Sequence, residues 1–441
     1  MIIRPVTKNR LYLPADVERK KNSASMNDRD ARDSFEKDYG RIVHSAAFRR
    51  LQSKTQVIGL DVGDFHRTRL THSMEVAQIA RGIVIHLNAN HPVFKEDYAL
   101  DASLIEAAAL AHDLGHPPFG HRGEEALHKC MQHYGGFEGN AHTFRILTRL
   151  EGDKENGLNL TRALLLSIMK YPILLDDAVC PKQYVKQGKV HPPKASAFLC
   201  DQEAFAWTLA SFTQEEREFF MKTIKPSDRH LQTINKTLEC SIIELADDIA
   251  YGTHDVEDSI NLGLIRIAQL KELMDPVYRK NKYPELIHAF KELDQLDPDQ
   301  DQLKYRLKKI FSAIISTLIT RLCVEIRNKP VSPRLKYQVQ LPPDLRLLLD
   351  QLKQLVVDKV IDSQKVQTVA WKGSYIIQQL FEAFMNEPKL LPENDRNQME
   401  FTFSDEERAR IVCDYIAGMT DSFAMKMYAR LFGQSRNFFD Y

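Results

Sequence analysis

Several features that mark particular classes of protein are missing from this 441-residue sequence. No apolar run reaches the roughly 18 residues that a membrane-spanning helix needs. The N-terminus also lacks a signal-peptide core, so we expect a cytoplasmic protein with no membrane partner. Lysine plus arginine equals aspartate plus glutamate, at 60 each, which argues against a protein that coats nucleic acid. Internal repeats and low-complexity segments are absent as well.

Cysteine is sparse, and its spacing excludes two kinds of framework. No two of the six cysteines form a Cys-x-x-Cys pair, so we expect neither a zinc knuckle nor a disulfide frame. Reduced and mostly buried thiols are expected at Cys130, Cys180, Cys200, Cys240, Cys323 and Cys413.

Helical periodicity dominates the chain and strand signals are few, so the predicted fold is mainly α. Residues 172–196 do not follow the helical period, which indicates an insertion, such as a lid or a loop over a functional site. Residues 329–343 hold an alternating stretch that predicts at most a short hairpin. We expect helices at about 33–51, 71–88, 102–113, 122–133, 140–150, 161–170, 201–223, 229–251, 262–279, 283–293, 302–327, from 343 to 385 and 404–432.

These patterns divide the chain into three predicted parts. Residues 1–30 are polar and charged, which favours a solvated arm or an oligomer contact. Residues 31–265 are expected to form a helical core, and residues 266–441 a C-terminal helical region.

The densest group of ionisable side chains lies in the stretch Leu110–Glu124. A strongly apolar helix leads into it, so His112 and Asp113 are expected at the inner end of a rigid, water-poor helix. Glycines and prolines then force a turn, and a new helix is expected to start near Arg122. Glu124 follows His121 by three residues on the same helix face, where it can orient the imidazole as an acid/base pair.

Two further ionisable residues lie on helices that otherwise belong to the core. His72 begins an amphipathic helix, and Asp247 stands in an apolar helix far downstream. Because an unpaired buried charge is costly, both need a partner. Together with His112 and Asp113 they predict a metal site with two nitrogen and two oxygen ligands and open positions for water and substrate.

The order His…His-Asp…Asp resembles the HD-domain phosphohydrolases, and neighbouring motifs narrow the likeness. These motifs resemble those of the deoxyguanosine triphosphate triphosphohydrolase family, especially its bacterial dGTPase-like branch. The matching motifs extend from about residue 29 to about residue 432. The motifs are Arg32–Val57, Arg69-Leu-Thr-His-Ser, His112-Asp-Leu-Gly-His-Pro-Pro-Phe-Gly-His, Phe137-Glu-Gly-Asn and Asp414–Asp421.

The resemblance implies a role for each residue that matches a family motif. Residues 31–265 then hold the HD-domain core with the catalytic metal site, and residues 266–441 complete the substrate site and make the oligomer contacts. Metal ligands are His72, His112, Asp113 and Asp247. His121 and Glu124 form the acid/base pair, with His116 beside them as a catalytic residue. The substrate contacts are Gln56, Arg69, Asn140, Tyr251, Asp255 and Lys372; Asp247, Tyr251 and Asp255 are spaced by four and so share one helix face.

The implied activity is metal-dependent hydrolysis of deoxynucleoside triphosphates to a deoxynucleoside and tripolyphosphate. Mg²⁺ or Mn²⁺ is the expected cofactor, with other transition metals as alternatives. The expected partners are the dNTP substrate, further copies of the chain in a homo-oligomer such as a hexamer, and single-stranded DNA.

Two other functions stay open at this point. The first is an HD hydrolase for a different nucleotide phosphoester, such as a nucleoside monophosphate or a guanosine tetraphosphate alarmone. The second is a regulatory HD protein that binds single-stranded nucleic acid. The motifs outside the HD core argue against the first, and the intact ligand set and His121/Glu124 pair argue against the second.

Overall fold

The computed structural model describes residues 9–21, 29–56, 67–180, 185–186, 189–190, 192–227, 229–296, 303–329 and 331–433. The helices are α1 Ser34–His44, α2 Ala46–Arg50, α3 Arg69–Asn90, α4 Ala102–Ala111, α5 Gly120–Met131, α6 Gly139–Arg145, α7 Arg162–Ile168, α8 Leu175–Ala178, α9 Gln202–Leu209, α10 Gln214–Phe220, α11 Leu238–Asn261, α12 Ile267–Arg279, α13 Pro284–Asp294, α14 Leu303–Thr320, α15 Pro333–Lys336, α16 Pro343–Val356, α17 Gln364–Asn386, α18 Glu393–Glu400, α19 Asp405–Ala417 and α20 Asp421–Phe432. The strands are β1 Val185–Lys186, β2 Lys189–Val190, β3 Thr223–Ile224, β4 Gln232–Thr233, β5 Cys323–Ile326 and β6 Tyr337–Gln340.

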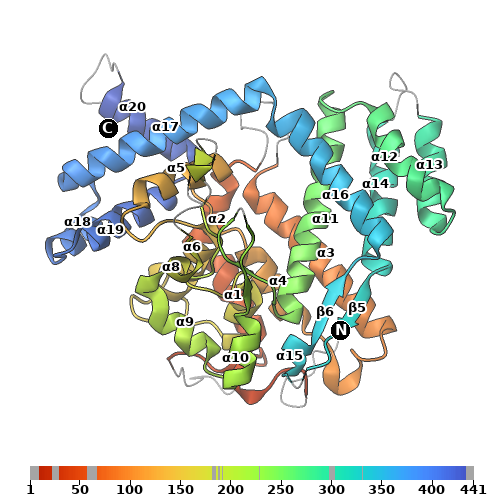
Figure 1. Cartoon of the computed structure of the whole chain (residues 1–441), viewed down its shortest axis with the longest axis horizontal. Coiled ribbons are helices and arrows are strands. Elements are labelled where there is room, and N and C mark those ends of the chain that lie inside the picture. The colour runs from red at the N-terminus through yellow and green to blue at the C-terminus, as the bar shows by residue number, and fades with distance from the viewer. Residues whose placement is uncertain are drawn as a thin grey trace.

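The mainly α fold is confirmed (Figure 1). The strands pair antiparallel as β1 with β2, β3 with β4 and β5 with β6, so the described residues contain three short pairs where one hairpin was expected. Two predicted helix boundaries are wrong for the same reason. The helix expected from residue 229 begins only at Leu238, after β4, and the helix expected to reach residue 327 ends at Thr320, before β5.

Three helices at the centre of the larger hydrophobic core position the expected metal ligands: α3 holds His72, α11 holds Asp247, and α4 ends directly before His112 and Asp113. Helices α3, α4 and α11 pack on one another. Each begins at a side chain that accepts a backbone N–H: Thr68 for α3, Asp101 for α4 and Thr237 for α11. Such caps satisfy donors that the first helical turn leaves free, and they fix where each helix starts.

A second hydrophobic core joins the segment after the His-Asp pair to the end of the chain. Helix α5 packs against α17 and α19, and α17 also contacts α20. In Figure 1 the long α17 runs across the top of the view, with α5 below it and the other C-terminal helices beside it. The functional region therefore lies where the two cores meet. The expected division of the chain at residues 30 and 265 stays a prediction.

The described part of the N-terminal segment is packed, so the expectation of a solvated arm is wrong for residues 9–21. Leu11 and Tyr12 are buried. Arg19 donates to Asp38 of α1 (2.5 Å), and Asp16 accepts from the buried Arg334 (2.8 Å). The segment thus ties the core to α15, which lies more than 300 residues later in the chain.

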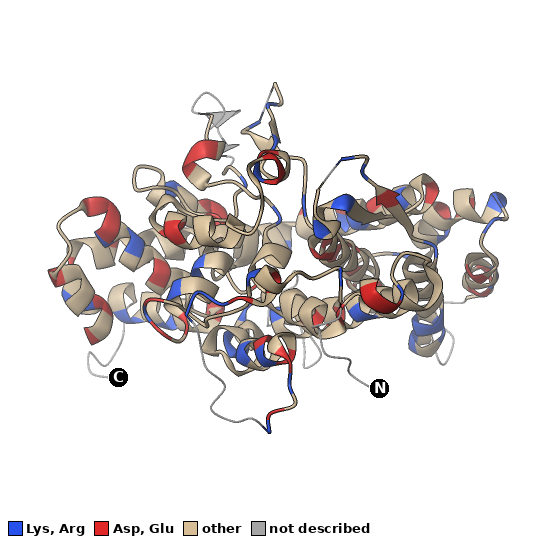
Figure 2. Cartoon of the chain, turned by 90° about the horizontal axis from the view of Figure 1, so that it is seen from below, with Lys and Arg blue, Asp and Glu red and all other residues tan. Residues whose placement is uncertain are grey.

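Surface and thiol properties follow in part from composition. Figure 2 shows lysine and arginine interspersed with aspartate and glutamate in that view of the chain. All six cysteines are free thiols, but only Cys240 and Cys413 are buried, so the expectation of mostly buried thiols is wrong. Within the described ranges no helix combines the length and the apolar character required to cross a membrane.

Candidate active site

His112 is prepared to use one particular nitrogen as a ligand. Its Nδ1 lies 2.6 Å from the carbonyl oxygen of Ala109, one turn back in α4. A carbonyl only accepts, so Nδ1 carries the proton and Nε2 keeps a free lone pair. That Nε2 is buried and has no hydrogen-bond partner among the described residues. An orphaned buried imidazole nitrogen is the state expected of a metal ligand without its metal.

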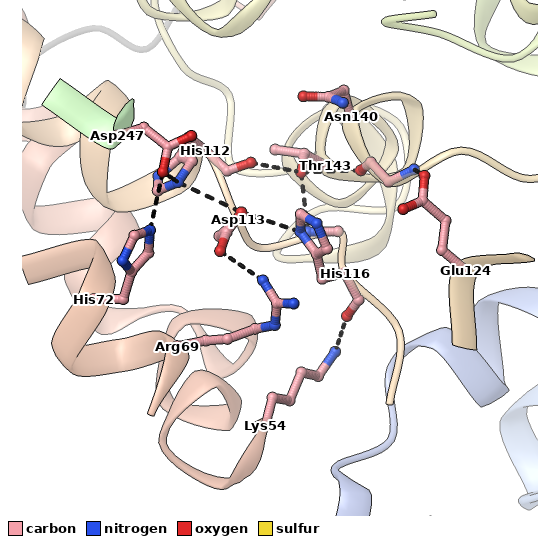
Figure 3. Close-up of polar contacts among 12 residues, drawn as sticks. Lys54, Arg69, His72, His112, Asp113, His116, Glu124, Asn140, Thr143 and Asp247 are labelled. Atoms are coloured by element: carbon pink, nitrogen blue, oxygen red, sulfur yellow. Dashed lines mark hydrogen bonds and ion pairs between the residues drawn. The ribbon is translucent and has the colours of Figure 1, made fainter. Parts of the chain in front are cut away.

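The nitrogen of His112 faces two of the other expected ligands (Figure 3). The Nε2 of His72 on α3 lies 3.0 Å from Oδ1 of Asp247 on α11, and the Nε2 of His112 lies 3.8 Å from the same oxygen. One ligand atom from each of the three residues lies within 4.8 Å of the other two. Burial opposes a charge on Asp247, but the hydrogen bond from His72 and the proximity of the two imidazoles keep the pKa of Asp247 below its usual range.

Asp113 stands beside this cluster and is engaged on its other side. Its Oδ2 accepts from Arg69 (2.7 Å), and its Oδ1 lies 3.1 Å from Nδ1 of His116 and 3.4 Å from Nε2 of His112. Burial acts against the charge, yet His116, His112 and Arg69 hold the pKa of Asp113 well below its usual range. The carboxylate is thus ionised and adjacent to the cluster, with Arg69 as its buried counter-ion.

His121 and Glu124 meet as the sequence predicts. Nδ1 of His121 lies 3.2 Å from Oε2 of Glu124 on the first turns of α5. The carboxylate is buried, while the imidazole side chain is 77% exposed. A fixed carboxylate with a solvent-facing imidazole is an arrangement suited to proton transfer at an incoming ligand.

Lys194 is a member of this site that the sequence did not reveal. Its Nζ donates to Glu124 Oε1 (2.9 Å) and lies 3.2 Å from Glu138 Oε1. Burial acts to raise the pKa of Glu124, but Lys194 and His121 outweigh it and hold that pKa well below its usual range. Lys194 belongs to the irregular segment 172–196, and its ammonium already neutralises Glu124. The group His116, His121 and Glu124 is therefore better suited to acid/base chemistry than to a second metal.

The turn between the two groups depends on a very close backbone approach. Gly115 donates to Thr143 Oγ1 of α6 (2.9 Å). A Cβ on Gly115 would lie 2.1 Å from the carbonyl oxygen of Gly139, a distance that no side chain permits. Because residue 115 has no side chain, the turn packs directly against the backbone of α6. The ring centroids of His116 and His121 are 5.6 Å apart. His116 so connects the metal cluster with the acid/base pair.

The structure shows different surroundings for the other expected substrate residues. Asp255 is buried with an unpartnered Oδ2, and burial raises its pKa to about 7. Tyr251 is half-buried on the same helix. Gln56 has a buried Oε1 without a partner among the described residues. Asn140 donates to Glu138 (2.8 Å), and Lys372 is exposed on α17.

Lys170 is a second cation near the site that sequence reasoning missed. Its Nζ lies 3.5 Å from Glu244 and above the ring of Tyr171, and its charge contributes to the lowered pKa of Asp247. In the sequence, Lys170 is the last residue of a predicted helix that stops at Tyr171-Pro172. Nothing in that context indicated a functional role for the lysine. Only the three-dimensional placement brings its charge towards α11.

Comparison with known proteins identifies the class. Residues 69–252 match the HD domain, and residues 339–430 match the phosphohydrolase-associated domain. The first range begins at Arg69 and ends just after Tyr251, so it encloses all four expected metal ligands. The second covers α16 to α20, apart from the last residues of α20; of these helices, α17 to α20 belong to the second core with α5, whereas α16 packs in the larger core.

Relatives of similar length narrow the class. A deoxyguanosinetriphosphate triphosphohydrolase-like protein of Vibrio campbellii is 39% identical over 91% of this chain and 93% of its own. One of Vibrio cholerae serotype O1 is 39% identical over 93% and 95%, and one of Shewanella pealeana is 40% identical over 91% and 93%. The chain belongs to this family of HD-domain phosphohydrolases.

HD domains bind divalent metals, and the residues of this chain fit such an ion. The cluster offers two imidazole nitrogens and a carboxylate oxygen, with a second carboxylate adjacent. The orphaned Nε2 of His112 supplies a lone pair that the described residues leave unused. Mixed nitrogen and oxygen donors suit Mn²⁺ and other first-row metals better than Ca²⁺, which prefers oxygen alone.

Proposed function

We propose that this protein hydrolyses deoxynucleoside triphosphates to a deoxynucleoside and tripolyphosphate, with a divalent metal held by His72, His112, Asp113 and Asp247. The observation that carries the proposal is the adjacency of two different groups. A cluster of candidate metal ligands, which includes one free imidazole nitrogen, and an oriented imidazole–carboxylate pair meet at His116. Lewis-acid polarisation of a phosphoryl oxygen is the chemistry that a divalent ion in such a cluster supplies.

The residues of the chain would share the remaining work. The buried Nε of Arg69 has no partner among the described residues and is available to a phosphate oxygen. Lys170, Lys194 and Lys372 would add positive charge for the triphosphate. His121, oriented by Glu124, would hold the proton that the leaving 5′-oxygen of the nucleoside needs. Gln56 and Asn140 would contact the base or sugar side.

Selection for deoxyribose is assigned to helix α11. Tyr251 follows the metal ligand Asp247 by one turn, and Asp255 follows Tyr251 by another. A ring held at this place would leave little room for a 2′-hydroxyl. The unpartnered Oδ2 of Asp255 would accept a hydrogen bond from the 3′-hydroxyl.

The nucleoside product tests the proposal. The protein is incubated with each dNTP, singly and in mixtures, with Mg²⁺ or Mn²⁺, and the nucleoside products are separated by chromatography. Free deoxynucleoside supports the proposal. Release of a deoxynucleoside mono- or diphosphate, or hydrolysis only of a nucleoside monophosphate or an alarmone, would favour a different HD phosphohydrolase and contradict it.

A homo-oligomer, such as a hexamer, is part of the proposal. Large apolar side chains are exposed on the C-terminal helices and the loop between them: Trp371, which stacks on Tyr375, and Phe403, which is fully exposed. Exposed apolar groups of this size are typical of surfaces that another chain covers. Light scattering after size-exclusion chromatography tests this, and a monomeric mass would contradict it. For single-stranded DNA, balanced charge favours only modest, salt-dependent binding.

A further inference from the structure

The helix that presents His121 starts from a backbone turn of unfavourable conformation. Phe119 has φ 65° and ψ 22°, in the left-handed region, and Gly120 follows with φ 59°. For a residue with a large side chain this region is sparsely populated, so the surrounding structure has to hold it there. His121 is the next residue, and the direction of its side chain depends on this turn.

A carboxylate from the far end of the sequence holds the turn. Asp421, the first residue of α20, is 3% exposed. Its Oδ1 accepts from the backbone N–H of Phe119 (3.1 Å), and its Oδ2 accepts from the backbone N–H of Thr55 (3.0 Å). Hydrogen bonds to a charged acceptor are the stronger kind, and here one buried charge satisfies two backbone donors.

The residue before Thr55 makes the matching bridge. The Nζ of Lys54, which is also buried, donates to the carbonyl oxygens of His116 (2.5 Å) and Ala417 (2.9 Å). Lys54 and Asp421 therefore fix the two ends of the turn, His116 and Phe119, to the same place between α19 and α20. Figure 3 shows the Lys54 ammonium directed at the backbone of His116.

Packing closes the remaining side of the turn. Gly373 on α17 lies so near that a Cβ there would come within 2.5 Å of Cγ of Phe119. The aromatic ring thus rests directly on the backbone of α17, and the glycine is what permits the contact. The turn has a polar anchor on one side and a tight apolar contact on the other.

We propose that Asp421 is a positioning residue for His121, and that the C-terminal helices act on the reaction by holding the turn at Phe119. This rests on the proposed role of His121. It gives the segment that matches the phosphohydrolase-associated domain a defined task in the active site of the HD domain. The task needs no contact with substrate, because Asp421 acts through the backbone of Phe119.

Asp421→Asn is the primary test, because it keeps the side-chain size but leaves only one acceptor oxygen for two N–H donors. We expect kcat to fall about a hundredfold, the cost of a misplacement near 1 Å, with bound metal and KM little changed. Asp405→Asn, at the exposed first position of α19, is the matched control and should leave kcat unchanged. Equal losses in both variants, or no loss with Asp421→Asn, would overturn the proposal.

A double-mutant cycle separates positioning from general stability. In a His121→Ala background, Asp421→Asn should lower kcat no further, since the residue it positions is gone. The same factor in both backgrounds would overturn the proposal. Gly373→Ala offers a second approach to the same turn: the added methyl group displaces Phe119 without touching Asp421, and should reproduce the loss of kcat. Unaltered kcat in that variant would count against the proposal.

A readout without substrate keeps the inference separate from the proposed function. In protein labelled with ¹³C and ¹⁵N at histidine, the ring resonances of His121 should move in Asp421→Asn and not in Asp405→Asn. Unmoved His121 resonances would overturn the positioning role. If the unmodified protein releases no deoxynucleoside, the proposed function fails, and these resonances still decide whether Asp421 sets the environment of His121.

Discussion

The Nζ of Lys194 lies 2.9 Å from Oε1 of Glu124, and the second oxygen of the same carboxylate lies 3.2 Å from His121. A lysine from the irregular segment before α9 therefore contacts the carboxylate that orients the proposed acid/base residue. Because of this contact, the charge state of Glu124 depends on a lysine that lies 70 residues later in the sequence.

Lys194→Met should shift the pH dependence of turnover. Lys194 is the strongest of the groups that lower the pKa of Glu124. Without it burial dominates, the pKa of Glu124 rises, and the carboxylate is protonated at a higher pH. The acid limb of the kcat profile should move to higher pH, as measured by initial rates across the pH range. Lys129→Met, on the exposed face of α5, is the control. An acid limb at the same pH in the unmodified protein and in both variants would refute the role of Lys194 in lowering the pKa of Glu124.

His112→Ala should lower bound metal and abolish turnover together. The variant removes the Nε2 lone pair that the bond to Ala109 directs at His72 and Asp247. Metal content after dialysis, measured by mass spectrometry, and dNTP turnover are compared with His133→Ala, which alters an exposed histidine. Full metal content with normal turnover in His112→Ala would show that the ligands are wrongly assigned.

Asp255→Asn should stabilise the metal-free protein at high pH. Burial raises the pKa of Asp255 to about 7, whereas the pKa of an unfolded aspartate is about 3.9. Between these values the native state binds one proton more than the unfolded state, so stability falls as the pH rises from 4 to 7, by roughly 4 kcal/mol at most. The carboxamide cannot ionise and avoids this loss.

Thermal unfolding in the presence of a chelator tests the sign of this effect. The gain in Tm for Asp255→Asn should be small at pH 4.5 and largest at pH 8. Asp177→Asn, at an exposed carboxylate of α8, should show no gain at either pH. A lower Tm for Asp255→Asn at pH 8 would mean that the ionised carboxylate is stabilised in the native protein.

Some of this site follows from local sequence, and some of it has no local signal. The apolar run before His112 predicts α4, and the spacing of three predicts that His121 meets Glu124, because both depend on helical geometry. Both the Lys194–Glu124 contact and the Asp421–Phe119 bond join segments that only folding brings together. Strands of two residues, such as β3, show no alternation and cannot be recognised from their sequence.

Tyr251 tests the proposed sugar selectivity. The unmodified protein should hydrolyse dGTP and nearly ignore GTP, because a buried hydroxyl without a partner costs about 1–3 kcal/mol, or roughly 5- to 150-fold in kcat/KM. Tyr251→Ala should reduce the difference in kcat/KM between dGTP and GTP, whereas Tyr251→Phe, which keeps the ring, should retain that difference. Equal kcat/KM for dGTP and GTP in the unmodified protein would refute the selectivity.

The most direct measurement of the central claim is ³¹P NMR of dNTP hydrolysis in ¹⁸O-enriched water, with His121→Ala as the control. Attack at the α-phosphorus predicts intact tripolyphosphate as the only phosphate product, with one ¹⁸O on a terminal phosphorus. The His121→Ala protein should form it about two to four orders of magnitude more slowly, with its metal still bound. Orthophosphate or pyrophosphate as the first product, or an unlabelled tripolyphosphate, would contradict the claim.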